Sequence, residues 1–202
     1  MRSLLFISAI VFFSCGQKSD KTTATDDSLT IKNDTSGKIE STKDAAGVNK
    51  QQPTALFEKA DAMLQTKYPG KWKIINDTID NWPKDEFDYF IKDKRKEYPD
   101  YPYIATGDYN ADGKADIAAL VVNTTNKDEQ RIAILLDTTK IVIWNDDVRG
   151  AAINTNPKEE IGSIDGKKSQ MKSEGINVEF FEKSSWILYW NGSAFKKLWT
   201  SD

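Results

Sequence analysis

The sequence contains no histidine and a single cysteine, Cys15, among its 202 residues. Histidine is the commonest general base and the usual zinc ligand, so its absence excludes Ser/His and Cys/His nucleophile pairs. One cysteine excludes an internal disulfide and a thiolate metal cluster. The formal net charge is −3, whereas nucleic-acid binding relies on clustered Lys and Arg. We therefore expect a protein that is not an enzyme and that has neither a nucleic-acid partner nor a disulfide-linked partner.

Long apolar runs are also absent, apart from one near the start of the chain. Residues 4–13 are almost entirely apolar, which is too short for a membrane span of about 20 residues but suits the apolar core of a signal peptide. Arg2 precedes this run and Ser14-Cys15-Gly16 ends it. The ending resembles the lipobox of bacterial lipoproteins, although Phe12 and Phe13 are bulkier than the residues usual at those positions.

The lipobox resemblance implies that residues 1–14 are a signal peptide that is removed, and that Cys15 is acylated, with palmitate among its chains. Acylation makes a membrane of the bacterial cell envelope a partner of this protein, because two or more acyl chains hold a protein there essentially permanently. We expect the outer membrane and leave its face open. The alternative is an ordinary secretory signal with an incidental cysteine.

Residues 15–52 are mostly polar and contain no aromatic side chain. Such a composition cannot bury enough apolar surface to offset the loss of chain entropy on folding. We therefore predict a lipidated, disordered tether over residues 15–52, followed by one domain over residues 53–202. A segment of about 150 residues suits one domain with a core of its own.

The spacing of apolar residues predicts the architecture of this domain. Residues 56–64 carry apolar side chains every three or four positions, which indicates an amphipathic helix that ends near Tyr68. A second helix is predicted from Pro83 to about Tyr98, with a basic end that is solvated. The polar stretch 145–173 is predicted to be a mobile insertion.

Eight short runs have the composition of β-strands, and a type I′ hairpin turn is expected at Asn191-Gly192. The runs are residues 71–74, 103–105, 116–122, 131–136, 140–144, 176–180, 186–190 and 194–199. The predicted fold class is α+β, with a mostly antiparallel sheet and about two helices packed on one face of it.

One acidic loop has the composition of a metal site. Residues 108–116 fit the pattern D-x-N-x-D-G-x-x-D, with oxygen-bearing side chains at loop positions 1, 3, 5 and 9 and a glycine at the sharp turn. Calcium takes six to eight oxygen ligands, and this spacing wraps the chain around one cation. The expected ligands are the side chains of Asp108, Asn110, Asp112 and Asp116 and the carbonyl oxygen of Lys114. We therefore predict calcium as a structural cofactor; the alternative is an acidic turn without an ion.

The loop is not an EF-hand, because Ala119 stands at position 12, where an EF-hand has a bidentate Glu. Residues 107–122, a loop followed by an apolar strand, resemble the calcium-binding hairpin of FG-GAP and VCBS-type repeats instead. The resemblance implies the same five ligands and a role in ligand recognition. It covers one loop, and the length of the chain excludes a whole propeller.

Two other groups of residues bear on function. Aromatic residues concentrate in the last third of the chain, where exposed rings could stack on a sugar or a peptide and buried rings would form core. Trp186 and Trp190 share parity along their strand, so we expect them to face the same side. Neighbouring acids do not by themselves form a catalytic pair. The acids considered are Asp146, Asp147, Glu159, Glu160 and Asp165.

The leading hypothesis is a non-enzymatic, calcium-stabilised envelope lipoprotein that binds a protein or glycan ligand. The first alternative is an inhibitor or accessory subunit of an envelope enzyme, which an ordered, protruding segment within residues 145–173 would favour. The second is a calcium-dependent hydrolase, which requires a further acid that converges with Asp108 or Asp116 in a pocket.

Overall fold

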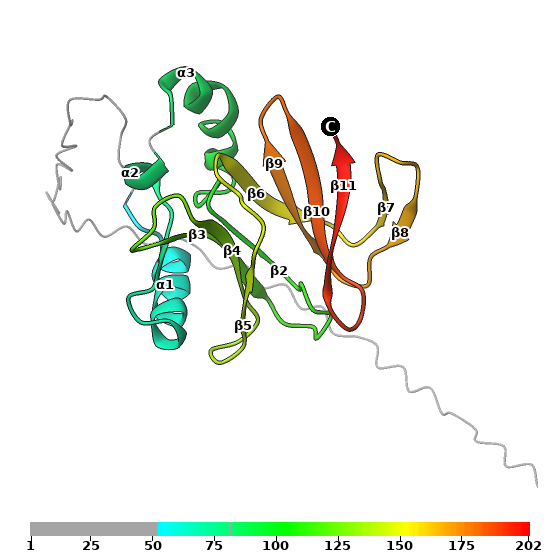
Figure 1. The fold of residues 1–202 in the computed structure, drawn as a ribbon, viewed down its shortest axis with the longest axis horizontal. Coiled ribbons are helices and arrows are strands. Elements are labelled where there is room, and N and C mark those ends of the chain that lie inside the picture. Colours follow the sequence, from blue (N-terminus) through cyan, green and yellow to red (C-terminus); the bar gives the residue numbers. More distant parts are fainter. Residues whose placement is uncertain (1–51, 81) are drawn as a thin grey trace, which may run out of the picture. The chain divides into compact units, whose positions relative to one another are not determined.

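The computed structural model describes residues 52–80 and 82–202 (Figure 1). The predicted signal peptide, Cys15 and the predicted tether up to residue 51 lie outside the described residues. In the described part of the chain, none of the helices has the length and apolar character needed to cross a membrane.

A first sheet of five strands is built around a central strand, and all of its pairs are antiparallel. Its strands are β1 (Trp72–Ile74), β2 (Ile104–Gly107), β3 (Asp116–Asn123), β4 (Gln130–Leu135) and β5 (Ile141–Trp144). β1 and β2 both pair with the same side of β3, and β4 and β5 follow on the other side. Residues 116–122 are all buried, so both faces of this sheet are covered.

A second sheet has four antiparallel strands in the order β11, β10, β9, β6. Its strands are β6 (Ala151–Asn156), β9 (Gly175–Phe180), β10 (Ser184–Trp190) and β11 (Phe195–Ser201). β10 and β11 form the predicted hairpin, but the two-residue type I′ turn expected at Asn191-Gly192 is wrong, because Trp190 pairs with Phe195 and residues 191–194 form the turn. A separate antiparallel hairpin consists of β7 (Glu160–Gly162) and β8 (Lys168–Gln170).

The first predicted helix is confirmed as α1 (Ala55–Lys67). Thr54 caps it, because its Oγ1 accepts a hydrogen bond from the backbone N–H of Phe57 at 3.1 Å. Ala60 and Leu64 are completely buried where α1 packs against β1 and β4. The three- and four-residue spacing therefore identified the face that this helix buries.

The prediction of a second helix is wrong, because the segment from Pro83 to Tyr98 does not form one continuous helix. The chain instead forms short turns, which are α2 (Asp77–Asp80), α3 (Lys84–Glu86), the π-helical η1 (Phe87–Ile91) and the 3₁₀ turn η2 (Lys94–Lys96). The N–H of Lys92 bonds to the carbonyl of Phe87, which is the π register and breaks the α-helical ladder. Arg95 is not solvated as expected of the basic end, because it turns inward to Asp77.

The predicted mobile insertion at residues 145–173 is also wrong. It contains β6, β7 and β8, and Ile153, Ile161 and Met171 within it are buried. Its apolar residues occur singly or in short groups between polar ones, which hides the strand signal. Each of these side chains is buried by contact with a neighbouring element, so no continuous apolar run is needed to form the strands.

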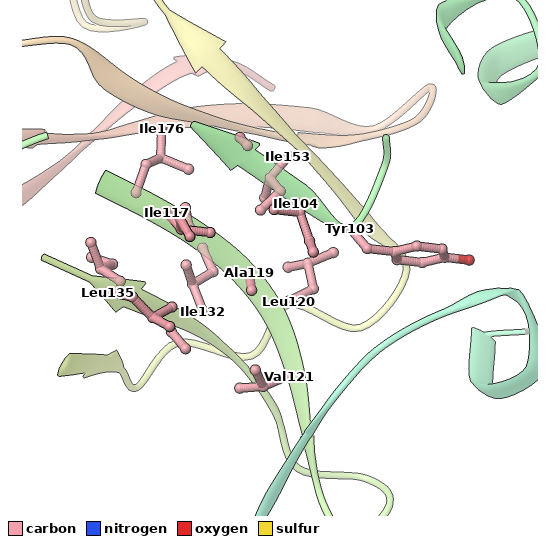
Figure 2. Close-up of a cluster of buried hydrophobic side chains, with 14 of the residues drawn as sticks. Tyr103, Ile104, Ile117, Ala119, Leu120, Val121, Ile132, Leu135, Ile153 and Ile176 are labelled. Atoms are coloured by element: carbon pink, nitrogen blue, oxygen red, sulfur yellow. The ribbon is translucent and has the colours of Figure 1, made fainter. Parts of the chain in front are cut away.

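The two larger sheets share one core (Figure 2). Ile153 and Ile176 of the second sheet lie beside Ile104 and Ile117 of the first. The fold is α+β and mostly antiparallel, which confirms the predicted class. Its strands form two larger sheets and the β7–β8 hairpin rather than one sheet, and the shared core covers an apolar face of each larger sheet.

Candidate functional site

The predicted calcium loop connects β2 to β3 and reverses the chain sharply. Gly113 has a φ of +80°, in the left-handed region that glycine favours, as expected for loop position 6. Ala111 is also left-handed, with a φ of +62°, which is uncommon for a residue with a Cβ. These two positions bend the chain so that the side chains at positions 1, 3 and 5 turn toward the backbone of the loop itself.

Backbone N–H groups of the loop hold its oxygen-bearing side chains in place. The two carboxylate oxygens of Asp108 accept hydrogen bonds from the N–H groups of Asp112 at 3.1 Å and Gly113 at 3.0 Å. The Oδ1 of Asn110 accepts from the N–H of Asp112 at 2.9 Å. The Oδ1 of Asp112 accepts from the N–H of Lys114 at 2.9 Å. The structure thus brings together the predicted side chains at positions 1, 3 and 5.

Asp116, at position 9, closes the loop from its buried side. Its side chain is at the start of β3 and the residue is only 1% exposed. Its Oδ2 accepts a hydrogen bond from the N–H of Tyr109 at 2.9 Å, but no described residue donates to its Oδ1. Burial raises the pKa of Asp116 to about 6. The N–H of Tyr109 opposes this rise, and the charges of Asp112 and Asp108 add to it. The backbone N–H of Asn110 also lowers the pKa slightly, although it does not form a hydrogen bond with Oδ1.

The loop carries carboxylate, amide and main-chain oxygen atoms rather than a cluster of carboxylates alone. Across residues 52–80 and 82–202, no group of three or more His, Cys, Asp or Glu is arranged to hold a metal ion by itself. The expected ligand set also includes the amide oxygen of Asn110 and the main-chain carbonyl of Lys114. Calcium accepts such mixed sets of carboxylate, amide and carbonyl oxygens.

Residues outside the motif hold the loop against the second sheet, and none of them was predicted. The Oε2 of Glu174 accepts a hydrogen bond from the N–H of Asp108 at 2.6 Å, and the N–H of Glu174 donates to the carbonyl of Asp108 at 3.1 Å. The buried hydroxyl of Ser173 donates to the carbonyl of Tyr109 at 3.1 Å. Only the three-dimensional fold brings these residues beside a loop that lies far from them in sequence.

Tyr109 makes a further connection between the loop and the second sheet. Its ring is completely buried, and its hydroxyl lies 2.8 Å from the Oγ1 of Thr155 in β6. Burial raises the pKa of the Tyr109 hydroxyl well above its usual value. Gly107 makes this packing possible, because a Cβ there would lie 2.8 Å from the Oε2 of Glu174 and 2.9 Å from the ring of Tyr109.

The aromatic residues of the last third belong mainly to the core. Trp186 is 1% exposed and Trp190 packs on the same core, so the two face one side as predicted, and that side is the interior. Trp199 is the exception, with 43% of its surface exposed. The Nζ of Lys197 lies 4.7 Å from the centre of the Trp199 ring and 5.2 Å from that of Trp186, and it forms an ion pair with Asp146.

The other acids considered from the sequence do not converge. Four of them form separate ion pairs with neighbouring cations, and the fifth accepts a hydrogen bond from an asparagine. The pairs are Asp146–Lys197, Asp147–Arg149, Glu160–Lys168 and Asp165–Lys167, and the hydrogen bond joins Asn156 to Glu159.

A second polar cluster, centred on Arg95, was not predicted. The guanidinium of Arg95 binds both carboxylate oxygens of Asp77, at 2.7 and 2.6 Å, and its Nε donates to the carbonyl of Tyr101 at 2.6 Å. The hydroxyl of Tyr103 donates to Asp77 at 3.0 Å. Burial raises the pKa of the nearby Asp80 to about 6, with a further contribution from the charge of Asp77. The donor groups in these bonds all have acceptors, so the cluster fixes α2 and η2 to the turn before β2.

The loop at residues 108–116 is therefore the better candidate site, since it combines clustered oxygen atoms with a buried carboxylate oxygen that lacks a partner among the described residues. Comparison of the chain with models of protein families, with curated proteins and with solved structures found no match.

Proposed function

We propose that this chain is a non-enzymatic lipoprotein of the bacterial cell envelope whose domain binds one calcium ion at residues 108–116, and that the ion stabilises the fold. The observation that carries the proposal is the buried carboxylate of Asp116, whose Oδ1 has no partner among the described residues. A buried charged group without a compensating partner is costly, and a bound cation would remove that cost. Calcium would also offset the mutual repulsion of Asp108, Asp112 and Asp116.

The residues of the loop contribute to calcium binding in two different ways. Asp108, Asn110 and Asp112 are oriented by backbone N–H groups of the loop, so little side-chain freedom remains to be lost when an ion binds. Asp116 belongs to β3, the central strand of the first sheet. An ion held by both parts ties the loop to the most buried strand of the domain.

Calorimetric titration of calcium into the full-length protein, purified in detergent and stripped with a chelator, tests this proposal. We expect heat of binding and a higher melting temperature, both lost in Asp112→Ala. The control is Asp128→Ala, which removes an exposed acid from the turn at the other end of β3 and should bind as the wild type does. Absence of heat and of a melting shift at millimolar calcium would refute the ion site.

The lipid anchor rests on Cys15, the apolar run of residues 4–13 before it and the lipobox resemblance. Residues 15–52 would allow the domain to stand roughly 30–37 Å from its anchor, if they form a flexible chain. Metabolic labelling with a clickable palmitate analogue should tag the wild type but not Cys15→Ser. A label that persists in Cys15→Ser, or that never appears in the wild type, would contradict the anchor.

A second candidate function is that of an inhibitor or accessory subunit of an envelope enzyme. It is favoured by the ordered β7–β8 hairpin within residues 145–173. Ile164, in the turn of this hairpin, is 56% exposed, and its N–H donates to the carbonyl of the exposed Trp199 at 3.0 Å. This backbone hydrogen bond brings the two exposed apolar residues close together in the fold. A photo-crosslinking amino acid at Ile164, but not at the exposed Lys158, should then give a discrete adduct in the envelope.

A further inference from the structure

Glu174 links the candidate calcium loop to the second sheet through a reciprocal pair of hydrogen bonds. It precedes β9, and its carboxylate accepts from the N–H of Asp108 at 2.6 Å while its own N–H donates to the carbonyl of Asp108 at 3.1 Å. A hydrogen bond to a carboxylate is about twice as strong as one between neutral groups. Asp108 is thus both the first expected calcium ligand and the partner of Glu174.

We propose that Glu174 is a positioning residue for the calcium loop, through which binding of the ion secures β9 and the second sheet. This inference rests on the proposed function, because it requires that the loop binds calcium. Glu174 does not belong to the spacing pattern of the loop and stands outside the ligand set that the sequence predicts.

The coupling follows from the charges around Asp108. Without a cation, the charges of Asp108 and Asp112 disfavour the charge of the buried Asp116, and Glu174 places a further carboxylate at the backbone N–H of Asp108. The loop can relieve this repulsion by opening, and opening would move the backbone atoms of Asp108 to which Glu174 is bound. A bound cation removes the repulsion and keeps those atoms in the docked position.

Further contacts fix the position of the calcium loop against the second sheet. The hydroxyl of Ser173 bonds to the carbonyl of Tyr109, and the hydroxyl of Tyr109 lies 2.8 Å from the Oγ1 of Thr155. Gly107 permits this close approach, because a side chain there would contact Glu174, Tyr109 and Thr155. The loop therefore docks in one position, and docking and ion binding favour the same conformation. Such coupling is reciprocal, so loss of docking must weaken ion binding by the same factor as loss of the ion weakens docking.

The test uses the full-length protein and three variants. Glu174→Ala removes the acceptor, Glu174→Gln keeps an acceptor oxygen without the charge, and Glu160→Ala is a matched control that removes an exposed carboxylate from β7. Calcium affinity is measured by calorimetry, and amide hydrogen exchange of β9 is measured with and without saturating calcium. We expect calcium to slow exchange in β9 of the wild type and of Glu160→Ala. In Glu174→Ala we expect affinity to fall about tenfold and the effect on β9 to disappear even when calcium is saturating.

The outcomes separate this inference from the proposed function. If Glu174→Ala binds calcium with wild-type affinity and β9 still gains protection, Glu174 has only a structural role and the inference is wrong, although the calcium site stands. If the wild type binds no calcium, the proposed function itself fails. If Glu174→Ala does not fold, Glu174→Gln decides the question: weaker binding together with a smaller effect on β9 supports the coupling, and wild-type values of both overturn it.

Discussion

The substitution Asp116→Asn would separate two effects of the Asp116 carboxylate, which are the energetic cost of its buried charge and its proposed binding of calcium. Asparagine has nearly the same shape and keeps an oxygen that can accept the N–H of Tyr109, but it carries no charge. In the wild type without calcium, the carboxylate is 1% exposed and its Oδ1 has no partner among the described residues. Leaving a buried polar group unsatisfied costs about 1–3 kcal/mol. The variant removes the charge but leaves its own Nδ2 group without an acceptor, so we expect it to be more stable than the wild type by at most that amount when a chelator is present.

Calcium should reverse this order. At a calcium concentration about 100 times its Kd, one bound ion adds about 2.7 kcal/mol to the free energy of unfolding of the wild type. Asp116→Asn loses a charged ligand, so we expect it to gain little of this stabilisation. Urea unfolding followed by tryptophan fluorescence, in chelator and in calcium, measures all four free energies of unfolding. Asp128→Asn, in the exposed turn after β3, is the control and should behave as the wild type does in both buffers.

Two results would refute the reasoning. If Asp116→Asn were less stable than the wild type in chelator, the buried charge would carry no cost, because other groups would compensate it. If Asp116→Asn gained as much stability from calcium as the wild type, Asp116 would not be a ligand. Either result can be read without reference to the other, since each compares two proteins in a single buffer or one protein in two buffers.

Three further predictions concern packing and titration. Gly107→Ala should lower the free energy of unfolding by about 1–3 kcal/mol, because its Cβ would meet Glu174, Tyr109 and Thr155 within 3.0 Å. Gly162→Ala, where the space is open, is the control and should change this free energy little. Equal effects of the two substitutions in urea unfolding would contradict this packing. Burial raises the pKa of Asp80 to about 6 from 3.8, so the folded state binds the proton of this carboxyl group more tightly than the unfolded chain does. The free energy of unfolding should therefore fall as the pH rises from 4 to 6, and it should fall less steeply in Asp80→Asn. Identical pH profiles of the two proteins would contradict the raised pKa. Trp186→Ala should cost about 3–5 kcal/mol and Trp199→Ala less than about 1 kcal/mol, and thermal melting that ranked them the other way would place the wrong ring in the core.

The parts of the fold that the sequence predicted are those whose signal is local. The apolar spacing around Leu64 marks the buried face of α1, and an unbroken apolar run from Ile117 to Val122 marks β3. The loop before β3 is also local, since glycine at position 6 and oxygen-bearing residues at positions 1, 3, 5 and 9 constrain the backbone directly. Gly113 is left-handed as that pattern requires.

What the sequence did not predict depends on contacts between distant segments. The helix expected from Pro83 to Tyr98 is interrupted by the π turn at Phe87–Ile91, and Arg95 in the last turn binds Asp77; nothing in the periodicity of the segment indicates either feature. The strand β6 was missed because only Ala151, Ala152 and Ile153 are buried, too few to produce a pattern of period two. Glu174 has no motif of its own, and its role depends on the return of β9 to the end of β2.

A cross-link between the two sheets has particular value in a chain that cannot form an internal disulfide. Asp108 and Glu174 are separated by 66 residues, and a covalent link across such a span would contribute about 4 kcal/mol in the chain-entropy model. A calcium ion at about 100 times its Kd would contribute about 2.7 kcal/mol, a comparable amount, while leaving the link reversible. Under this proposal, loss of calcium would loosen the contact between Asp108 and Glu174, which joins the first sheet to the second. If the loop binds calcium as proposed, the ion and Glu174 together form a reversible link between the two sheets, since both act on Asp108.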